Sequence, residues 1–496
     1  MTHDPLWVGV DLGTQSVKAA VVDDRGDVAG RADAPLRSRR VDGLHEQDPA
    51  LWRTAAARAV AAVIAPLAPA ARERIGGISL CSTSGSVVLA DAAGIPATPG
   101  VMYDDLRGAS AAGEVAAAAP ALWARLGYSP QPSWPICTLA WWASHGDLRD
   151  RRLVLQGDVV AAAICGHPVP TDWTSALKLG YDTHELRWDD DLLEHLGVRR
   201  DILPDVVAPG TTIGVVGADW ARETGIPAGV PVFAGLTDGC AAQLASGALD
   251  AGAWHTVLGT TLVFKGVSAK PVSGGDGAVY AHRSPDGLTW LPGGASNTGA
   301  GMLAEVVSSD RDLAPLEAGA EALDPVTVPL SYPLTGVGER FPVVAPTARG
   351  FVLTADGTAP LDSLRALGPA GLLSAFAGVA FVERLGLEVL AADAASAVRT
   401  VSTSGGGTRS RLWNRVRASV LGVPLAITAA DGAVGAAMLA AWGARSGSER
   451  LAEVAARLSR PSTVVDPEPA WVRGLDDHYA RFTEALIRFG WLEART

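Results

Sequence analysis

A short pattern occurs twice in this chain, once near its start and once near its middle. The string LGTQSVKAAV begins at Leu12, and the string LGTTLVFKGV begins at Leu258. Each follows an apolar run, and two β-rich runs around a glycine-containing turn predict a hairpin. Because the same hairpin opens each half of the chain, we predict two related α/β domains that meet between Ala241 and Ala253.

Periodicity places further elements along the chain. Strands are expected at 27–34, 75–80, 86–91 and 226–236, in addition to the hairpin strands at 6–10, 17–22, 254–258 and 262–267. Helices are expected at 49–74, from Gly239 onward, at 409–420 and throughout the amphipathic tail at 451–495.

Charge and cysteine content limit the classes of function. The 496 residues carry 41 basic and 53 acidic side chains, a net charge of −12, which argues against nucleic-acid binding. The four cysteines are widely separated, which indicates neither a disulfide framework nor a zinc site and favours a reducing compartment. The uncharged run at 366–382 is too short for a bilayer span and predicts a buried helix. We therefore expect a cytoplasmic protein without a nucleic-acid or membrane partner.

The first candidate site is the turn after Asp11. Glycine lets a phosphate approach the backbone N–H groups of such a turn, and a carboxylate at the strand end suits Mg²⁺ held through water. The same residues could serve only to close a hairpin. A companion turn at Gly259-Thr260-Thr261 favours the first interpretation, because two facing Gly-Thr turns could hold a triphosphate from both sides.

Asp238 is the second candidate. It follows an apolar strand and precedes a helix, where open α/β folds place ligand chemistry. Its carboxylate could accept a proton from a hydroxyl that attacks phosphorus, as phosphoryl transfer requires. The alternative is an ordinary helix N-cap.

A third candidate is the glycine-rich string at 401–407. Strand, glycine turn and helix would give a base or ribose flat access, although a tight strand-to-helix turn has the same pattern. Neither a P-loop ending nor GxGxxG spacing is present. Ser84-Gly85-Ser86 lacks the surroundings of a nucleophile elbow, and the nine histidines have no metal-ligand spacing.

Taken together, these strings resemble the FGGY carbohydrate kinases of the actin, hexokinase and Hsp70 superfamily. The resemblance is carried by GVDLGTQSVK from Gly9, EQDP from Glu46, MYDDLR from Met102, GLTDG from Gly235, LGTT from Leu258 and SGGG from Ser404. It implies an α/β fold of two actin-like (ribonuclease H-like) domains around a nucleotide cleft. The implied segments are an N-terminal sugar-binding domain at 1–245, a C-terminal ATP-binding domain at 246–445, and C-terminal helices at 446–496 that pack on the domains.

The resemblance also implies a set of site residues. The ATP phosphates would meet Gly13, Thr14 and Gln15 on one side and Gly259, Thr260 and Thr261 on the other. Adenosine would rest against Gly405 and Gly406, with Trp413 or Asn414 along its edge. Mg²⁺ would be held near Asp11, mostly through water, and Asp238 would be the catalytic base. The expected substrate-binding residues are Asp11, Thr83, Ser84, Asp104 and Asp238.

Within the family, the chain is most similar to the xylulose kinase-like branch of D-ribulose kinases. ALKLGYD from Ala176, APGTTIG from Ala208, GGASNTG from Gly293 and GERFP from Gly338 carry this similarity. Xylulose kinases usually have a Gln-Met-His-Gly string where this chain has Thr83-Ser84-Gly85-Ser86. Where they have a Lys-aliphatic-x-Trp string, this chain has Cys-Thr-Leu-Ala-Trp at 137–141.

We therefore expect an ATP-dependent pentulose kinase, D-ribulose being the preferred sugar. The alternatives are a D-xylulose kinase or another ketose or polyol kinase, which would differ only in the pocket. A nucleotide-dependent sugar sensor without kinase activity is a further alternative. The resemblance also implies a homodimer.

Overall fold

The structure is a computed structural model that describes residues 4–146, 148–274, 277–307, 313–354, 357–429, 431–445 and 448–493. The chain forms two compact units. Unit 1 comprises Met1–Gly247, His282–Trp290 and Ala430–Arg460, and unit 2 comprises Ala248–Ala281, Leu291–Ala429 and Pro461–Thr496. The units differ from the predicted segments because the chain returns to unit 1 twice after Gly247. The predicted boundaries of the three sequence segments, after residues 245 and 445, stay a prediction.

Unit 1 is built on a seven-stranded sheet whose order is β14-β15-β6-β1-β2-β3, with β16 also paired to β6. The strands are β1 (Leu6–Leu12), β2 (Ser16–Asp23), β3 (Val28–Pro35), β6 (Ile75–Ser82), β14 (Thr212–Val215), β15 (Pro231–Phe233) and β16 (Leu236–Thr237). β1 and β2 form the expected antiparallel hairpin, and β6 runs parallel to β1. The predicted first hairpin and the strands at 27–34 and 75–80 are confirmed.

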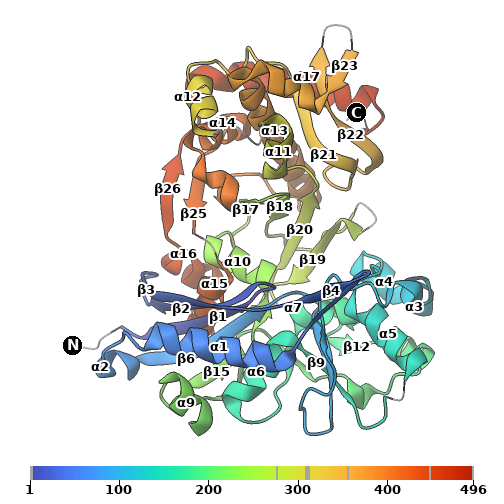
Figure 1. Ribbon diagram of the computed structural model, residues 1–496, viewed down its shortest axis with the longest axis vertical. Helices are drawn as coiled ribbons and strands as arrows, with labels where there is room; N and C mark the ends of the chain where they lie inside the picture. Colours follow the sequence, from blue (N-terminus) through green and yellow to red (C-terminus); the bar gives the residue numbers. More distant parts are fainter. Residues whose placement is uncertain are drawn as a thin grey trace. The chain divides into compact units, whose positions relative to one another are not determined.

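Helices cover both faces of this sheet. α1 (Pro49–Ile64) and α6 (Gln156–Cys165) lie side by side on one face, as Figure 1 shows, and α10 (Asp238–Ser246) and α15 (Gly432–Gly443) pack on the other. Successive side chains of a strand point to opposite faces. Leu6, Val8, Val10 and Leu12 therefore pack in the core beneath α1.

The opposite face of β1 carries Trp7, Gly9 and Asp11. Trp7 packs in a second core with residues of α15, and a Cβ at Gly9 would lie 1.8 Å from the Ala433 carbonyl oxygen. Glycine at this position lets α15 approach the strand closely. This approach brings the beginning of α15 to the end of β1, where Asp11 lies.

A smaller five-stranded sheet accompanies the main sheet in unit 1. Its order is β4-β5-β8-β7-β9, with β4 (Arg39–Val41), β5 (Leu44–Gln47), β8 (Gly100–Val101), β7 (Val87–Ala90) and β9 (Arg152–Leu155). The predicted strand at 86–91 is confirmed as β7. One expected strand at 226–236 is wrong in extent: it begins only at Pro231, after Pro227 and Gly229, and residues 234–235 separate it into β15 and β16.

Unit 2 contains a second seven-stranded sheet, in the order β19-β20-β18-β17-β24-β25-β26. Its strands are β17 (Ala253–Leu258), β18 (Leu262–Lys265), β19 (Val279–Arg283), β20 (Trp290–Ser296), β24 (Thr400–Ser404), β25 (Leu425–Thr428) and β26 (Pro461–Val465). β17 and β18 form the predicted second hairpin, and β24 runs parallel to β17 as β6 does to β1. The repeated pattern therefore corresponds to a repeated three-strand arrangement.

The helices α13 (Pro369–Asp393), α14 (Arg411–Leu421) and α17 (Pro469–Arg488) pack in unit 2 with the three-stranded sheet β21 (Ser331–Glu339), β22 (Ala345–Thr354) and β23 (Gly357–Pro360). α13 is long and apolar enough to span a bilayer, but 89% of its most apolar window is buried inside the protein. The expectation that 366–382 includes a buried helix is confirmed.

The C-terminal tail is not entirely helical. α16 (Leu451–Leu458) and α17 agree with the prediction, but β26 lies between them and pairs antiparallel with β25 at the sheet edge. This segment is a strand rather than a helix because it pairs with β25, which lies far from it in the sequence. The β-branched residues Val464 and Val465 suit an extended backbone.

Candidate functional site

The loop between β1 and β2 is held in place by several backbone contacts. The Gly13 N–H donates to the Ser16 carbonyl at 3.1 Å, and the Leu36 N–H donates to the Gln15 carbonyl at 2.8 Å. Gln47 donates from Nε2 to the Thr14 carbonyl at 2.7 Å, and its Oε1 accepts from the Trp52 indole at 2.6 Å. The family string at Glu46 thus supports the loop that was predicted to bind phosphate.

Asp11 lies at the end of β1, among strands from three parts of the chain. It pairs in register with Lys18 on β2 and Cys81 on β6. The Cys81 thiol lies 3.5 Å from Oδ1 of Asp11, and a Cβ at Gly432 would come within 2.8 Å of its carboxyl carbon. Only 8% of Asp11 is exposed. The first residue of α15 therefore closes directly over this carboxyl group.

Burial is the main cause of an unusually high pKa at Asp11. Burial, followed by the negative charge of Asp238, raises the pKa of Asp11 from 3.8 to about 6, although Lys18 and the Cys81 thiol act in the opposite direction. The two carboxyl groups predicted to carry the chemistry therefore interact electrostatically within unit 1. A bound cation would favour the charged form of Asp11.

We expect Asp11→Asn to raise the stability of the metal-free protein over that of the wild type by about 1.4 kcal/mol more at pH 8 than at pH 5. The native state keeps a proton on Asp11 up to about pH 6, whereas the unfolded state loses it near 3.8, so the wild type loses stability as the pH rises between these values. Thermal unfolding of both proteins at the two pH values measures the difference. Asp33→Asn, an exposed change on β3, is the control, and an equal response of the two variants would contradict the prediction.

Asp238 is the first residue of α10 and is exposed. The N-cap position of this helix is Thr237, and Asp238 is the first helical residue. Its own Oδ1 accepts from the Gly239 N–H at 2.6 Å. The pairing of Thr237 with Ser82 places Asp238 just beyond the carboxyl end of β6.

Of the predicted sugar-binding residues, Thr83 has a hydroxyl that is hydrogen-bonded within the protein, whereas Ser84 does not. The Thr83 hydroxyl bonds to the Ser86 hydroxyl at 2.6 Å and to Oε1 of Gln156 at 2.7 Å. Ser84 presents its carbonyl to the Lys178 ammonium at 3.1 Å, and its buried hydroxyl has no partner among the described residues.

Asp104 bonds to Nδ1 of His45 at 2.5 Å and to Arg40 at 2.9 Å. Burial acts to raise the pKa of its carboxyl, but these two hydrogen bonds hold that pKa below the usual range. Asp104 is therefore a charged group that the protein itself orients.

In unit 2, the turn after β17 packs against a second glycine-rich segment. The Gly259 N–H donates to the Thr261 carbonyl at 3.0 Å, and the Gly301 N–H donates to the Thr260 carbonyl at 3.0 Å. A Cβ at Gly299 would lie 2.6 Å from the Thr260 carbonyl oxygen. Gly299, in the string that begins at Gly293, thus lets this segment pack against the turn at Thr260.

The turn after β24 also requires glycine. Gly405 has φ +98°, and a Cβ there would lie 2.5 Å from the Leu258 carbonyl oxygen. Gly405 and Gly406 are both exposed, and a Cβ at Gly406 would meet nothing within 4 Å. An open, flat backbone surface at this turn is compatible with the predicted contact to adenosine.

Trp413 and Asn414 follow this turn at the start of α14. The Trp413 ring is 1% exposed and stacks on Phe376 at a centroid distance of 4.4 Å, so protein encloses it. Asn414 donates from its amide to the Thr408 carbonyl at 2.8 Å. In this structure both side chains support the glycine turn from within the protein.

A buried ion pair lies beneath the same turn. Arg417 of α14 donates two hydrogen bonds to Glu383 of α13 at 2.6 and 2.7 Å, and neither side chain is exposed. Arg417 also donates to the Thr403 hydroxyl of β24 at 2.7 Å. The pair therefore joins two helices to β24, the strand that ends at Ser404 just before Gly405.

Two of the strings that suggested the family branch meet at one buried carboxylate. Glu339 accepts from the Ser296 hydroxyl at 2.8 Å, the Asn297 N–H at 2.7 Å and the Tyr332 hydroxyl at 3.1 Å. It is 2% exposed. These strings thus have a structural role in unit 2.

Sequence reasoning missed Gln156, the residue that bonds to Thr83. It lies at the start of α6, 73 positions from Thr83, and no motif marks it. The only available signal was a glutamine between an apolar strand and an apolar helix, where its polar side chain needs a partner.

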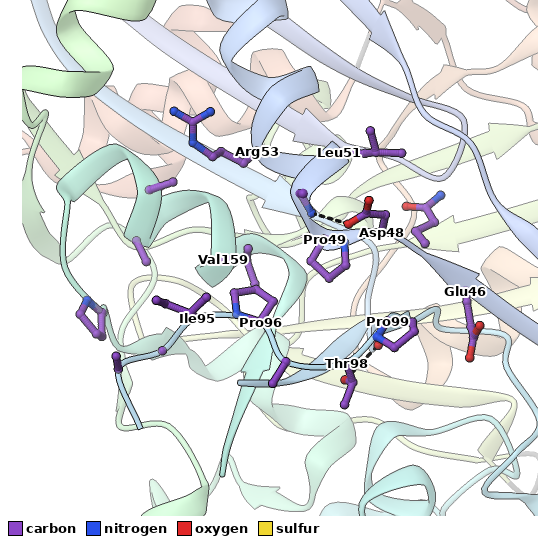
Figure 2. Close-up of a pocket in the computed structure, with 18 of the residues that line it drawn as sticks. Glu46, Asp48, Pro49, Leu51, Arg53, Ile95, Pro96, Thr98, Pro99 and Val159 are labelled. Carbon is purple, nitrogen blue, oxygen red and sulfur yellow. Dashed lines mark hydrogen bonds between the residues drawn. The ribbon is translucent and has the colours of Figure 1, made fainter. Parts of the chain in front are cut away.

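A cavity of about 1040 Å³ lies elsewhere in unit 1, and Figure 2 shows it between the beginning of α1, the loop at 93–99 and α6. Proline and aliphatic side chains, among them Pro49, Ile95 and Pro96, form much of its wall. None of the predicted site residues lines this cavity.

The fold and these turns define a class of protein: a two-domain actin-like kinase, with a Gly-Thr hairpin in each unit and a strand-end aspartate in the first. Comparison with known families agrees with this class. Residues 6–245 match the N-terminal domain and residues 255–444 match the C-terminal domain of the FGGY family of carbohydrate kinases. The chain belongs to this family and is an ATP-dependent carbohydrate kinase.

Several known proteins are similar over most of the chain. The xylulose kinase of Escherichia coli K12 is 26% identical over 91% of this chain and 90% of its own. That of Streptomyces coelicolor is 30% identical, with 88% of each chain covered. The crystal structure of a kinase from Brucella ovis, described as a xyloylose kinase, superposes with a TM-score of 0.84 at 26% identity and covers 98% of this chain and 100% of that one.

Proposed function

We propose that this carbohydrate kinase phosphorylates a pentulose, with D-ribulose as its preferred substrate and D-ribulose 5-phosphate as its product. The relatives named as xylulose kinases support a pentulose. The observation that carries the choice of D-ribulose is Thr83-Ser84-Gly85-Ser86 at the end of β6, where a xylulose kinase usually has Gln-Met-His-Gly. A hydroxyl-rich turn and a histidine make different hydrogen bonds, so they favour different sugars.

In the proposed reaction, the terminal hydroxyl oxygen of the sugar attacks the γ-phosphorus of ATP. A new O–P bond forms, the bond from that phosphorus to the bridging oxygen breaks, and ADP leaves. Asp238 accepts the hydroxyl proton as general base. Its exposure at the beginning of α10, beside the end of β6, supports this role.

The nucleotide contacts proposed are those expected from the sequence, except at Trp413 and Asn414, which are buried. The phosphates would be bound by Gly13, Thr14 and Gln15 and by Gly259, Thr260 and Thr261, and adenosine by the turn at Gly405 and Gly406. Asn414 and Trp413 would hold that turn in position.

We also propose that Asp11 binds Mg²⁺ through water. Among the described residues, no group of three or more His, Cys, Asp and Glu side chains could hold a metal ion. A single buried carboxyl group fits an ion that keeps its waters and binds phosphate oxygens. Bound Mg²⁺ would neutralise charge on the phosphates, and Asp11 would orient its waters.

A sugar panel tests the substrate. We expect release of ADP with Mg-ATP to be fastest, by kcat/KM, with D-ribulose when D-ribulose, D-xylulose, L-ribulose, L-xylulose and glycerol are compared. A higher kcat/KM with D-xylulose would favour the second candidate, which the names of the relatives support. A preference for glycerol would reject a pentulose substrate.

A homodimer and a cytoplasmic location stay predictions. Light scattering during size-exclusion chromatography measures the first, and fractionation of the source cells measures the second.

A further inference from the structure

Gln156 is a completely buried side chain whose hydrogen bonding is only half used. Its Oε1 accepts from the Thr83 hydroxyl at 2.7 Å and from the Thr83 N–H at 3.3 Å. Because a backbone N–H can only donate, the oxygen of the amide must face Thr83. The Nε2 group therefore points away from Thr83, and it has no partner among the described residues.

Two further unpartnered groups lie at the same strand ends. The hydroxyls of Ser84 and Thr237 are buried and lack a hydrogen bond within the described part of the chain. Thr237 pairs with Ser82 and precedes Asp238, and Ser84 follows Thr83. Thr237 thus lies next to the proposed base, and Ser84 and Gln156 lie at the residues that follow the end of β6.

Unpartnered buried groups of this kind need an explanation. Each costs about 1–3 kcal/mol, and few occur in a folded protein. The surrounding contacts are otherwise well formed, since Lys178 holds the Ser84 carbonyl and Ser86 holds the Thr83 hydroxyl. A ligand with several oxygens would supply the missing partners.

We propose that Gln156 is a specificity-determining residue of this kinase, whose Nε2 group donates a hydrogen bond to an oxygen of the sugar. Nε2 has only N–H groups to offer, so its partner must be an acceptor, as the carbonyl and hydroxyl oxygens of a ketose are. The Ser84 hydroxyl bonds to a neighbouring sugar hydroxyl, and Thr83 is a positioning residue that orients the amide. This inference rests on the proposed function, because it assigns a role in the same sugar site.

Gln156→Leu tests this role with little change in volume. We expect the KM for the sugar to rise at least about tenfold, while the KM for ATP stays unchanged. Gln156→Glu keeps the shape without the N–H donors and should also raise the sugar KM, which covers the case in which the leucine variant does not fold. Gln131→Leu, outside this cluster, is the matched control.

Monodeoxy analogues of the sugar locate the contact. For the wild type, removing the oxygen that Gln156 contacts should lower kcat/KM about tenfold or more, and in Gln156→Leu the same removal should cost little. A sugar KM in Gln156→Leu within twofold of the wild-type value would overturn the inference. So would equal losses with every analogue in both proteins, as expected if Nε2 only binds a structural water.

This experiment distinguishes an error in the proposed substrate from an error in the role proposed for Gln156. The sugar used is the one that the wild type phosphorylates with the highest kcat/KM, whatever its class. If that sugar is not a pentulose, the proposed substrate is wrong but the role of Gln156 is still measured. If it is D-ribulose and Gln156→Leu retains the wild-type KM, only the inference about Gln156 is wrong.

Discussion

Asp238→Asn is expected to lower kcat for sugar phosphorylation by a factor of about 10²–10⁴ and to leave ATP binding unchanged. Asparagine has nearly the same shape but does not accept the hydroxyl proton at neutral pH. Asp238 is exposed at the first position of α10, so the substitution removes a charge without opening a cavity in the core. It also removes the negative charge that helps to raise the pKa of Asp11.

Steady-state kinetics with coupled detection of ADP measures kcat, and calorimetric titration with ATP measures nucleotide affinity. Asp219→Asn is a matched control, because Asp219 is an exposed aspartate in the first turn of another helix of unit 1, α9 (Ala218–Thr224). This control should keep kcat within twofold. If Asp238→Asn also retained kcat within a few-fold of the wild type, Asp238 would not be the base.

Arg417→Met is expected to destabilise the protein by about 3–5 kcal/mol. Arg417 and Glu383 are fully buried in unit 2, and the methionine would leave the Glu383 carboxylate without its charged partner. It would also remove the hydrogen bond to Thr403 on the strand that leads to Gly405. We therefore expect a weaker apparent affinity for ATP as well.

Chemical denaturation monitored by fluorescence measures the loss, with separate transitions fitted where the two units do not unfold together. Arg415→Met is the control in the same helix, since Arg415 pairs with Glu468 at the surface and should contribute about 1 kcal/mol or less. The double variant Arg417→Met with Glu383→Leu should regain part of the lost stability, because no charge is left buried. A loss below about 1 kcal/mol in Arg417→Met would contradict this account.

Local patterns predicted the elements that begin each half of the protein. The apolar runs of β1 and β17, with glycine in each following turn, identified both hairpins, since these features depend on neighbouring residues. The position of Asp238 after a strand and before a helix was visible in the same way. The tail was predicted less well because β26 depends on pairing with β25.

The family strings were recognisable, but their physical roles were not. Gln47 supports the loop at Thr14, and Glu339 gathers the strings that begin at Gly293 and Gly338. Such roles depend on which distant side chain accepts or donates each hydrogen bond. No spacing within one string contains that information.

The sequence by itself determined two related α/β domains, a Gly-Thr turn in each and the two aspartates at strand ends, because apolar runs and turn residues act over a few positions. Only the tertiary structure decided that α15 returns to cover Asp11 through Gly432, and that Gln156 holds Thr83. Residues hundreds of positions apart make the first contact. Burial by that contact, together with the charge of Asp238, is what raises the pKa of Asp11.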